Sequence, residues 1–212
     1  MPPTEPVTNS TAAAVDTRRR ILDEAESLLL ARGFQAFSYQ HVAKALGVKP
    51  AAIHYHFPTK DDLGVALIQR QAARLAKWRA LPRVTELTPG GRFQALLDAY
   101  LGRLSHAGQL CFFGALAPGF DVLADPMRAE LRRFTAALTG WLAEVLAEGR
   151  ATGELRFVGE PMAKAAQVLT TLAGALQVAR VFNPAQFDLI VRQLVEELAP
   201  GGLPALPAKP GG

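Results

Sequence analysis

The 212-residue sequence predicts an all-α protein with an N-terminal three-helix head and a C-terminal helical bundle, about nine helices in all. Apolar residues recur at i, i+3 and i+4 along most of the chain, and no segment shows the sustained period-two alternation of a half-buried strand. Prolines, glycines and capping residues divide this pattern into segments of helix length. With 50% hydrophobic residues, the chain can bury one good core, or a small domain plus a larger one.

The segment from Phe37 to Leu63 has the spacing of a helix-turn-helix. Its first helix is expected over residues 40–46, with Ser38 as N-cap and Gly47 as the stop, and its second over residues 50–56, opened by a proline. The apolar residues that would fix the crossing are Val42, Leu46, Val48 and Ile53. The alternative is a plain helical hairpin inside a core, which has no need of so many polar and basic residues.

The two segments TRRRILDEAESLLLARGF and AKALGVKPAAIHYHFPTKDDL together resemble the N-terminal domain of TetR-type one-component transcription regulators. The resemblance covers about residues 16–75, and the remainder agrees only in length and helix pattern. The family usually carries tyrosine where this chain has His54, so the phosphate contact assigned to that tyrosine does not transfer directly and can be shared with Tyr55. The resemblance also implies that Lys60 contacts the DNA backbone.

Charge supports a nucleic-acid partner at one end of the chain only. Residues 1–80 carry 11 Lys/Arg against 7 Asp/Glu, and residues 81–212 carry 12 against 12, so the whole net charge of +4 lies with the helix-turn-helix. A chance fluctuation of four charges and, for Arg18 to Arg20, a solvated helix end are the alternatives. The candidate DNA-binding residues are Arg18, Ser38, Tyr39, Gln40, Lys49, Pro50, Ala52, His54, Tyr55 and Lys60.

The chain divides into a Pro/Thr/Ala-rich tail at residues 1–15, a DNA-binding domain at 16–62, a ligand-binding and dimerisation domain at 63–199 and a Pro/Gly-rich tail at 200–212. Both tails are expected to be disordered. Thr88 to Gly91 is expected to be a spacer, and Asp125-Pro126 a cap and first helical position. Outside the helix-turn-helix, helices are expected over residues 17–32, 59–81, 92–106, 111–116, 125–150, 161–182 and 184–198.

Residues 165–179 form a run without charge that is apolar around the whole helix circumference. A symmetric four-helix interface between two subunits would cover such a helix, and burial inside one subunit is the alternative. The candidate interface residues of this homodimer are Val168, Leu169, Leu172, Leu176, Leu189 and Leu194. The run is too short and too polar to span a bilayer and the chain begins with no signal peptide, so we expect a cytoplasmic protein with no membrane partner.

Amphipathic helices that carry aromatic residues suggest a cavity for a small apolar or amphipathic effector. Candidate lining residues are Trp78, Tyr100, His106, Phe112, Phe113, Phe134, Trp141, Gln177 and Arg180, with core packing as the alternative for each. Cys111 is a candidate sensor because it opens a short helix, where the dipole favours the reactive thiolate. Some TetR-type regulators sense electrophiles or oxidants with a cysteine in a similar position; a small buried hydrophobe is the alternative.

Enzyme chemistry finds no support in the sequence. The four histidines form no His-x-x-x-His pair, and no Gly-rich phosphate loop or nucleophile elbow is present, so we expect no catalytic residue, metal or other cofactor. The chain is predicted to be a transcriptional repressor that binds palindromic operator DNA as a dimer and is released by a small molecule. A thiol-based sensor using Cys111 and a protein–protein adaptor are the alternatives, and the adaptor would show no salt-dependent affinity for DNA.

Overall fold

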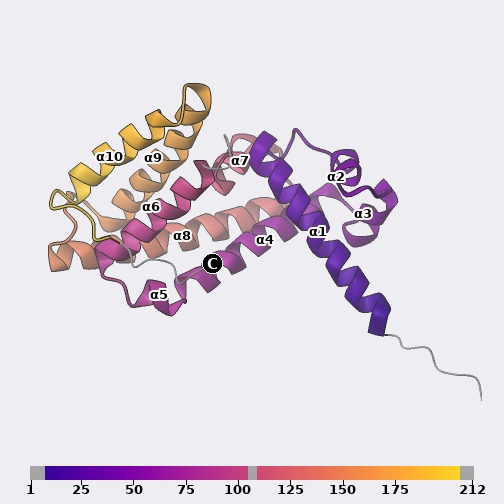
Figure 1. The fold of residues 1–212 in the computed structure, drawn as a ribbon, viewed down its shortest axis with the longest axis horizontal. Helices are drawn as coiled ribbons and strands as arrows, with labels where there is room; N and C mark the ends of the chain where they lie inside the picture. Colours follow the sequence, from indigo (N-terminus) through magenta and orange to yellow (C-terminus); the bar gives the residue numbers. More distant parts are fainter. Residues whose placement is uncertain (1–7, 105–108, 206–212) are drawn as a thin grey trace, which may run out of the picture.

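A computed structural model describes residues 8–104 and 109–205, which contain ten α-helices, one 3₁₀ helix and no strand. The head consists of α1 (Thr8–Arg32), α2 (Tyr39–Leu46) and α3 (Pro50–His56), and α4 (Lys60–Arg79) runs from the head alongside α8 (Asp125–Thr152) into the body (Figure 1). The other body helices are α5 (Pro82–Thr85), α6 (Pro89–Leu104), α7 (Phe112–Leu116), η1 (Ala117–Val122), α9 (Pro161–Val181) and α10 (Ala185–Leu198). The predicted all-α class is confirmed, and α5 and η1 are additions to the predicted helices.

Local signals end and begin the short helices of the head. Gly47 closes α2 in the left-handed conformation, with φ of 66°, and the N–H of Val48 reaches back to the carbonyl of Ala43 at 3.0 Å. Thr59 caps α4: its hydroxyl accepts from the N–H of Asp62 at 3.1 Å, and the Asp62 carboxylate accepts from the N–H of Thr59 at 2.9 Å. These boundaries agree with the predicted ones.

Three helix starts differ from the prediction. Helix α1 begins at Thr8, so part of the expected N-terminal tail is helical. Helix α6 begins at Pro89 because its first turn is capped: Thr88 Oγ1 accepts from the N–H of Gly91 at 3.2 Å, and the Glu154 carboxylate accepts from the N–H of Gly90 at 3.1 Å. The cap of α8 is Ala124 rather than Asp125, which already belongs to the helix. The spacer expected before α6 is therefore its first turn.

Two clusters of buried apolar side chains lie along the molecule. The first, the head core, combines residues of α1 to α4 with Phe34, Phe37 and Phe57 of the connections between them, and with α7 and the first half of α8. The second, the far core, combines α6, the second half of α8, α9 and α10. Leu138 of α8 packs against both. The head thus shares a core with the near end of the body, and it is not a separate globule.

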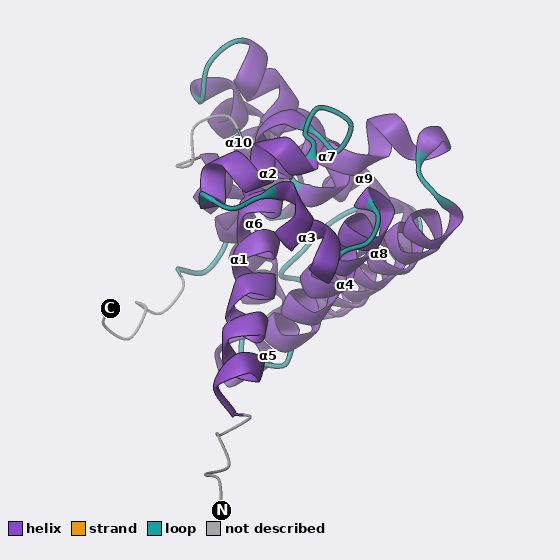
Figure 2. Ribbon diagram, turned by 90° about the vertical axis from the view of Figure 1, so that its right-hand side faces the viewer, coloured by secondary structure: helices purple, strands orange, loops and turns teal. Residues whose placement is uncertain are grey.

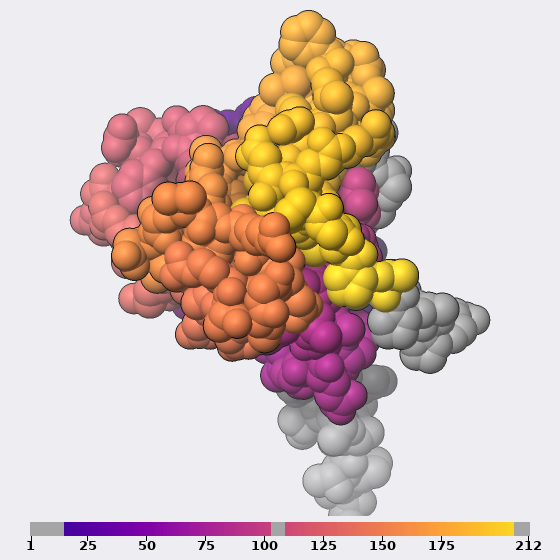
Figure 3. Space-filling view, turned by 90° about the vertical axis from the view of Figure 1, so that its left-hand side faces the viewer, coloured from indigo at the N-terminus to yellow at the C-terminus, as the bar shows by residue number. Residues whose placement is uncertain are grey.

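The expected dimer interface on α9 requires a correction. Val168, Leu172 and Leu176 are buried in the far core of a single subunit, as is Leu194 of α10, because α8 and α10 pack against α9. Leu169 is half-buried, and only Leu189 of the predicted set is largely exposed, at 58%. Burial within one subunit, the alternative considered above, accounts for most of the apolar face of α9. Figure 3 shows the outer surface formed by α10 at the end of the body.

Candidate nucleic-acid interface and body cavity

Helix α3 is seated on the head by one side and presents the other to solvent. Ile53 is fully buried in the head core. Lys49, Pro50, His54 and Tyr55 are exposed, and Tyr55, at 81%, is the most exposed large aromatic residue of the described chain. Figure 2, which views the molecule from the head end, shows α2 and α3 toward the viewer. An exposed second helix of this kind has the geometry that enters a major groove.

His54 is held in place at the end of α3. Its ring lies edge-on to Tyr39, with centroids 4.7 Å apart, and its Nδ1 is 3.2 Å from the carbonyl oxygen of Pro58. A carbonyl only accepts, so Nδ1 carries the proton in this contact. The ring of Tyr55, in contrast, lies edge-on to that of its neighbour His56, with centroids 5.1 Å apart.

The expectation that Tyr39 offers its side chain to DNA requires a correction. Tyr39 is buried, and its hydroxyl donates to the carbonyl of Phe57 at 2.8 Å while also lying against the carbonyl of Thr59. Burial, with the nearby charges of Asp62 and Asp61, raises the pKa of Tyr39 to about 12. The hydroxyl therefore joins the start of α2 to the turn between α3 and α4, a pairing of residues 18 and 20 positions apart.

Cationic residues lie around the same turn. The guanidinium of the exposed Arg18 is 5.0 Å from the ring centroid of Phe57. The Lys60 ammonium lies 4.6 Å from the Phe34 ring and 4.9 Å from the Phe37 ring, and burial lowers its pKa. Among the remaining candidates, Gln40 is exposed, whereas Ser38 and Ala52 are half-buried. Apart from Tyr39, the predicted set reaches at least partly to the surface of the head.

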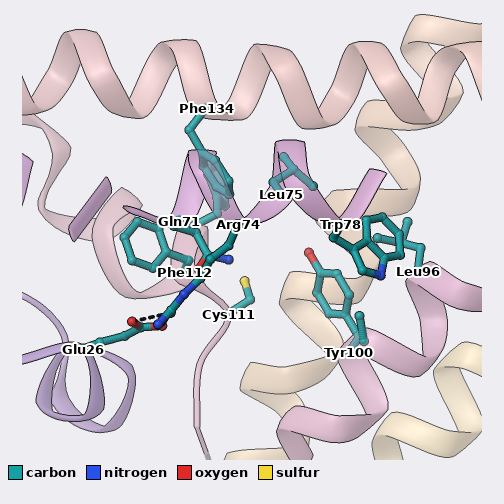
Figure 4. A pocket seen from close by; sticks show the side chains of 12 residues that line it. Glu26, Gln71, Arg74, Leu75, Trp78, Leu96, Tyr100, Cys111, Phe112 and Phe134 are labelled. Atoms are coloured by element: carbon teal, nitrogen blue, oxygen red, sulfur yellow. Dashed lines mark hydrogen bonds and ion pairs between the residues drawn. The ribbon is translucent and has the colours of Figure 1, made fainter. Parts of the chain in front are cut away.

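A cavity of about 260 Å³ lies where the head meets the body (Figure 4). Five of the predicted lining residues surround it: Trp78, Tyr100, Phe112, Phe113 and Phe134. They come from four helices, α4, α6, α7 and α8, and all five are aromatic residues of the kind that line small-ligand sites. The other lining residues are Glu26, Gln71, Arg74, Leu75, Leu96, Ala99 and Cys111.

Three predicted pocket residues do not line this cavity. Trp141 packs edge-on against Trp78 in the far core, with ring centroids 5.2 Å apart. Gln177 and Arg180 are exposed on α9, and Arg180 donates to the carbonyl of Ala31, a residue at the end of α1, at 2.9 Å. His106 lies outside the described residues.

Cys111 occupies the predicted position at the start of α7 and is also part of the cavity wall. Its Sγ accepts from the N–H of Gly114 at 3.2 Å, and the residue is buried. Figure 4 shows the sulfur directed toward the interior of the cavity, between Tyr100 and Arg74. A molecule that enters the cavity would meet the thiol directly.

Sequence reasoning missed the polar end of the cavity, which Glu26, Gln71 and Arg74 form. Glu26 lies on α1 of the head, and Arg74 on α4 donates to both of its carboxylate oxygens, at 2.8 and 2.6 Å. In the sequence, both residues fit a solvated helix face, and no local signal pairs two residues 48 positions apart. One wall of the cavity thus belongs to the head.

Two absences concern the described residues alone. They contain no group of three or more His, Cys, Asp or Glu side chains placed to hold a metal ion. No helix among them combines the length and the apolar character needed to cross a membrane.

Comparison with known proteins matches both parts of the chain. Residues 21–67 match the family described as bacterial regulatory proteins, tetR family, and residues 89–194 match the tetracyclin repressor-like, C-terminal domain. The HTH-type transcriptional repressor NemR of Escherichia coli K12 is 27% identical over 180 residues, which cover 80% of this chain and 88% of NemR.

Solved structures agree with these matches. A TetR family regulator from Agrobacterium tumefaciens has a TM-score of 0.82 and 28% identity, covering 88% of this chain and 99% of that one. A TetR transcriptional regulator from Legionella pneumophila has a TM-score of 0.74 and 30% identity, covering 85% and 95%.

Proposed function

The chain belongs to the TetR family of bacterial transcription regulators, and on that premise we propose that it is a homodimeric repressor released from a palindromic operator by a small apolar or amphipathic effector. The family assignment makes it a helix-turn-helix DNA-binding regulator and not an enzyme. We propose repression of transcription rather than activation because NemR is a transcriptional repressor. Its site of action is the cytoplasm, where bacterial operator DNA lies.

The exposed face of α3 carries the DNA-binding part of the proposal. Lys49 is exposed at the start of the helix, where it can contact a phosphate. Tyr55 and His54 are exposed near the other end of the helix, away from Ile53 and the head core. A two-fold dimer would set two such helices into successive major grooves about 34 Å apart. Contacts of this kind give an affinity that falls steeply with salt.

The dimer surface that we propose is the exposed side of α9 and α10. Small residues follow one stripe of α9, at Ala166, Thr170 and Gly174, and Leu189 is exposed on α10. Small side chains allow two helices to approach closely, and Leu189 would be covered by the second copy. Leu189→Glu should therefore give monomers in analytical ultracentrifugation, whereas Val158→Glu, at an exposed site between α8 and α9, should leave the dimer intact.

The cavity is the proposed effector site because its walls join α1 of the head to α4, α6, α7 and α8 of the body. A ligand there contacts the helices whose relative position orients the head. Modification of Cys111 is the second candidate signal, favoured by the position of its sulfur in the cavity wall. A thiolate there would add to an electrophile and place the adduct inside the cavity.

DNA binding is tested with a duplex of the intergenic DNA beside the protein's own gene, titrated by fluorescence anisotropy at two salt concentrations. We expect saturable binding that is selective over a scrambled duplex. Lys49→Ala should weaken it at both sequences and reduce the salt slope by about 1, whereas Arg156→Ala, which removes an exposed positive charge from the body, should not. The absence of any selective binding would contradict the proposal and favour a protein–protein adaptor.

The two candidate signals are separated by one variant. N-ethylmaleimide should release the operator from the wild type and not from Cys111→Ser if the thiol is the switch. Release of both proteins, or of neither, would reject the thiol and leave a reversible ligand as the effector.

A further inference from the structure

Four charged side chains join α1 of the head to α4, and we call them the head latch: Asp23 and Glu26 on α1, Arg70 and Arg74 on α4. Arg70 donates to Asp23 at 2.6 Å and to the carbonyl of Leu22 at 2.7 Å, and it is also paired with Glu26. Arg74 grips both oxygens of Glu26. Glu26 is therefore shared between two guanidinium groups.

The two arginines of the head latch differ in how firmly they are held. The side chains of Arg70 and Glu26 are only 17% and 15% exposed, whereas that of Arg74 is 51% exposed. If Arg74 turned away, Glu26 and Asp23 would both keep Arg70, and no buried charge would lose its last partner. If Glu26 were removed instead, both arginines would lose an ion pair of the head latch, and the loss of stability would be larger. Arg74 is thus the member that a ligand can recruit.

Only one half of the head latch borders the cavity. Arg74 and Glu26 line it, with Gln71 beside them, while Arg70 and Asp23 do not. Figure 4 shows the bonded Glu26–Arg74 pair at one end of the cavity and Trp78 with Leu96 at the other. The cavity therefore has a polar end that can donate hydrogen bonds and a long apolar remainder.

We propose that the effector is a small amphipathic carboxylate that binds Arg74 in place of Glu26. The planar fork of a guanidinium matches a carboxylate with two parallel hydrogen bonds, and the Gln71 amide lies beside it to donate another. The apolar part of the ligand packs between Trp78, Tyr100 and Phe112. An organic cation would instead have to approach Glu26 beside two guanidinium groups.

This inference rests on the proposed function only for its consequence. Once Arg74 binds the ligand, one of the two arginine ties between α1 and α4 is lost, and Arg70 is the arginine that remains between the two helices beside their apolar packing. The equilibrium position of the head then depends on occupancy of the cavity, which is the differential interaction that a ligand-driven switch requires.

Ligand class is tested by isothermal titration calorimetry at pH 7.5 with benzoate and 3-phenylpropanoate, each against its amide, and with benzylammonium. In the wild type, at least one carboxylate should bind about ten-fold more tightly than its amide. Arg74→Gln should abolish that preference, and Lys77→Gln, which removes an exposed charge from the same helix outside the cavity, should keep it. Equal binding of acids and amides, tighter binding of benzylammonium, or a preference that survives in Arg74→Gln would overturn the proposal.

Arg74→Lys is a second variant for the case that Arg74→Gln does not fold. It keeps the positive charge and loses only the planar pair of donors, so it should bind the carboxylate with intermediate affinity. Operator binding is measured separately, with and without the carboxylate. A carboxylate preference in a protein that binds no operator would support the ligand assignment and contradict the proposed function. Operator binding by a protein without any carboxylate preference would contradict the ligand assignment alone.

Discussion

The head core and the far core are stabilised in different ways. Helices α2 and α3 of the head are eight and seven residues long, too short to be stable alone. Specific polar contacts hold them, such as the hydrogen bond from the Tyr39 hydroxyl to the Phe57 carbonyl and the one from the N–H of Val48 to the carbonyl of Ala43 at the end of α2. Helices α8 and α9 are 28 and 21 residues long and pack through apolar faces. Short helices need defined partners, whereas long amphipathic ones need mainly a covered face.

The largest effect should come from truncating one aromatic residue in each core. Phe37→Ala in the head core and Phe187→Ala in the far core should each lower the free energy of unfolding by about 3–5 kcal/mol, because both side chains are buried. Trp141 belongs to the far core and Trp78 packs against it, so fluorescence reports that region, whereas circular dichroism reports all helices.

We expect urea unfolding to shift equally in both signals for both variants, since α4 and α8 pass through both regions and Leu138 contacts both cores. A Phe37→Ala protein that shifts in circular dichroism but not in fluorescence would show two independently folding cores instead.

The next largest effects should come from glycine-to-alanine substitutions, which should change the stability of the two regions differently. A Cβ on Gly149 would lie 2.7 Å from Cγ of the buried Leu155, and we expect a loss of about 1–2 kcal/mol in stability. A Cβ on Gly64 would meet the flexible end of Met127, with Cε at 2.4 Å. That side chain can move, and the gain in helix propensity of about 1 kcal/mol offsets the strain. Thermal unfolding in which Gly64→Ala loses as much as Gly149→Ala would contradict this distinction.

Removing the Tyr39 hydroxyl should lower the free energy of unfolding by less, and this effect should depend on pH in the alkaline range. Tyr39→Phe should cost about 1 kcal/mol at pH 8, because the buried carbonyl of Phe57 loses its donor. The raised pKa of about 12 means that unfolded tyrosine ionises first, near pH 10, so this contribution is full below pH 10 and lost as pH rises toward 12. Urea unfolding at pH 9 and 11 should show the difference between the two proteins narrowing. A difference independent of pH would contradict a stabilising hydrogen bond from the Tyr39 hydroxyl.

Glu154 at the base of α6 should give the smallest effect, with the opposite pH dependence. The hydroxyl of Thr88 lowers the pKa of Glu154, with help from the N–H of Gly90 and the hydroxyl of Thr152 and against the effect of burial. Its contribution is therefore present above about pH 4.5 and lost as pH falls. Glu154→Gln should cost about 0.3–1 kcal/mol at pH 7, the usual value of a carboxylate at a helix N-terminus. Thermal unfolding at pH 7, 4 and 3 should show the difference between wild type and Glu154→Gln shrinking as the pH falls; a difference that grows at low pH would contradict this role of Glu154.

Much of the head was predictable from residues close together in the chain. Gly47, Pro50 and the Thr59–Asp62 pair set the limits of α2, α3 and α4 within a few residues, because caps and stops act on the adjacent turn. The same reasoning missed the start of α6, where Pro89 and two glycines look like a spacer. The carboxylate of Glu154, 64 positions from Gly90, helps to stabilise that turn as a helix.

The sequence by itself determined the helical class, the helix-turn-helix and the family, since these depend on periodicity and local motifs. Only the tertiary structure decided that Val168, Leu172 and Leu176 face the core of their own subunit, because a helix apolar all round does not reveal which side is covered. It likewise decided that the Tyr39 hydroxyl donates to the Phe57 carbonyl within the head and that Glu26 pairs with Arg74 in the cavity wall. Pairings of residues many positions apart arise from packing, and no local pattern encodes them.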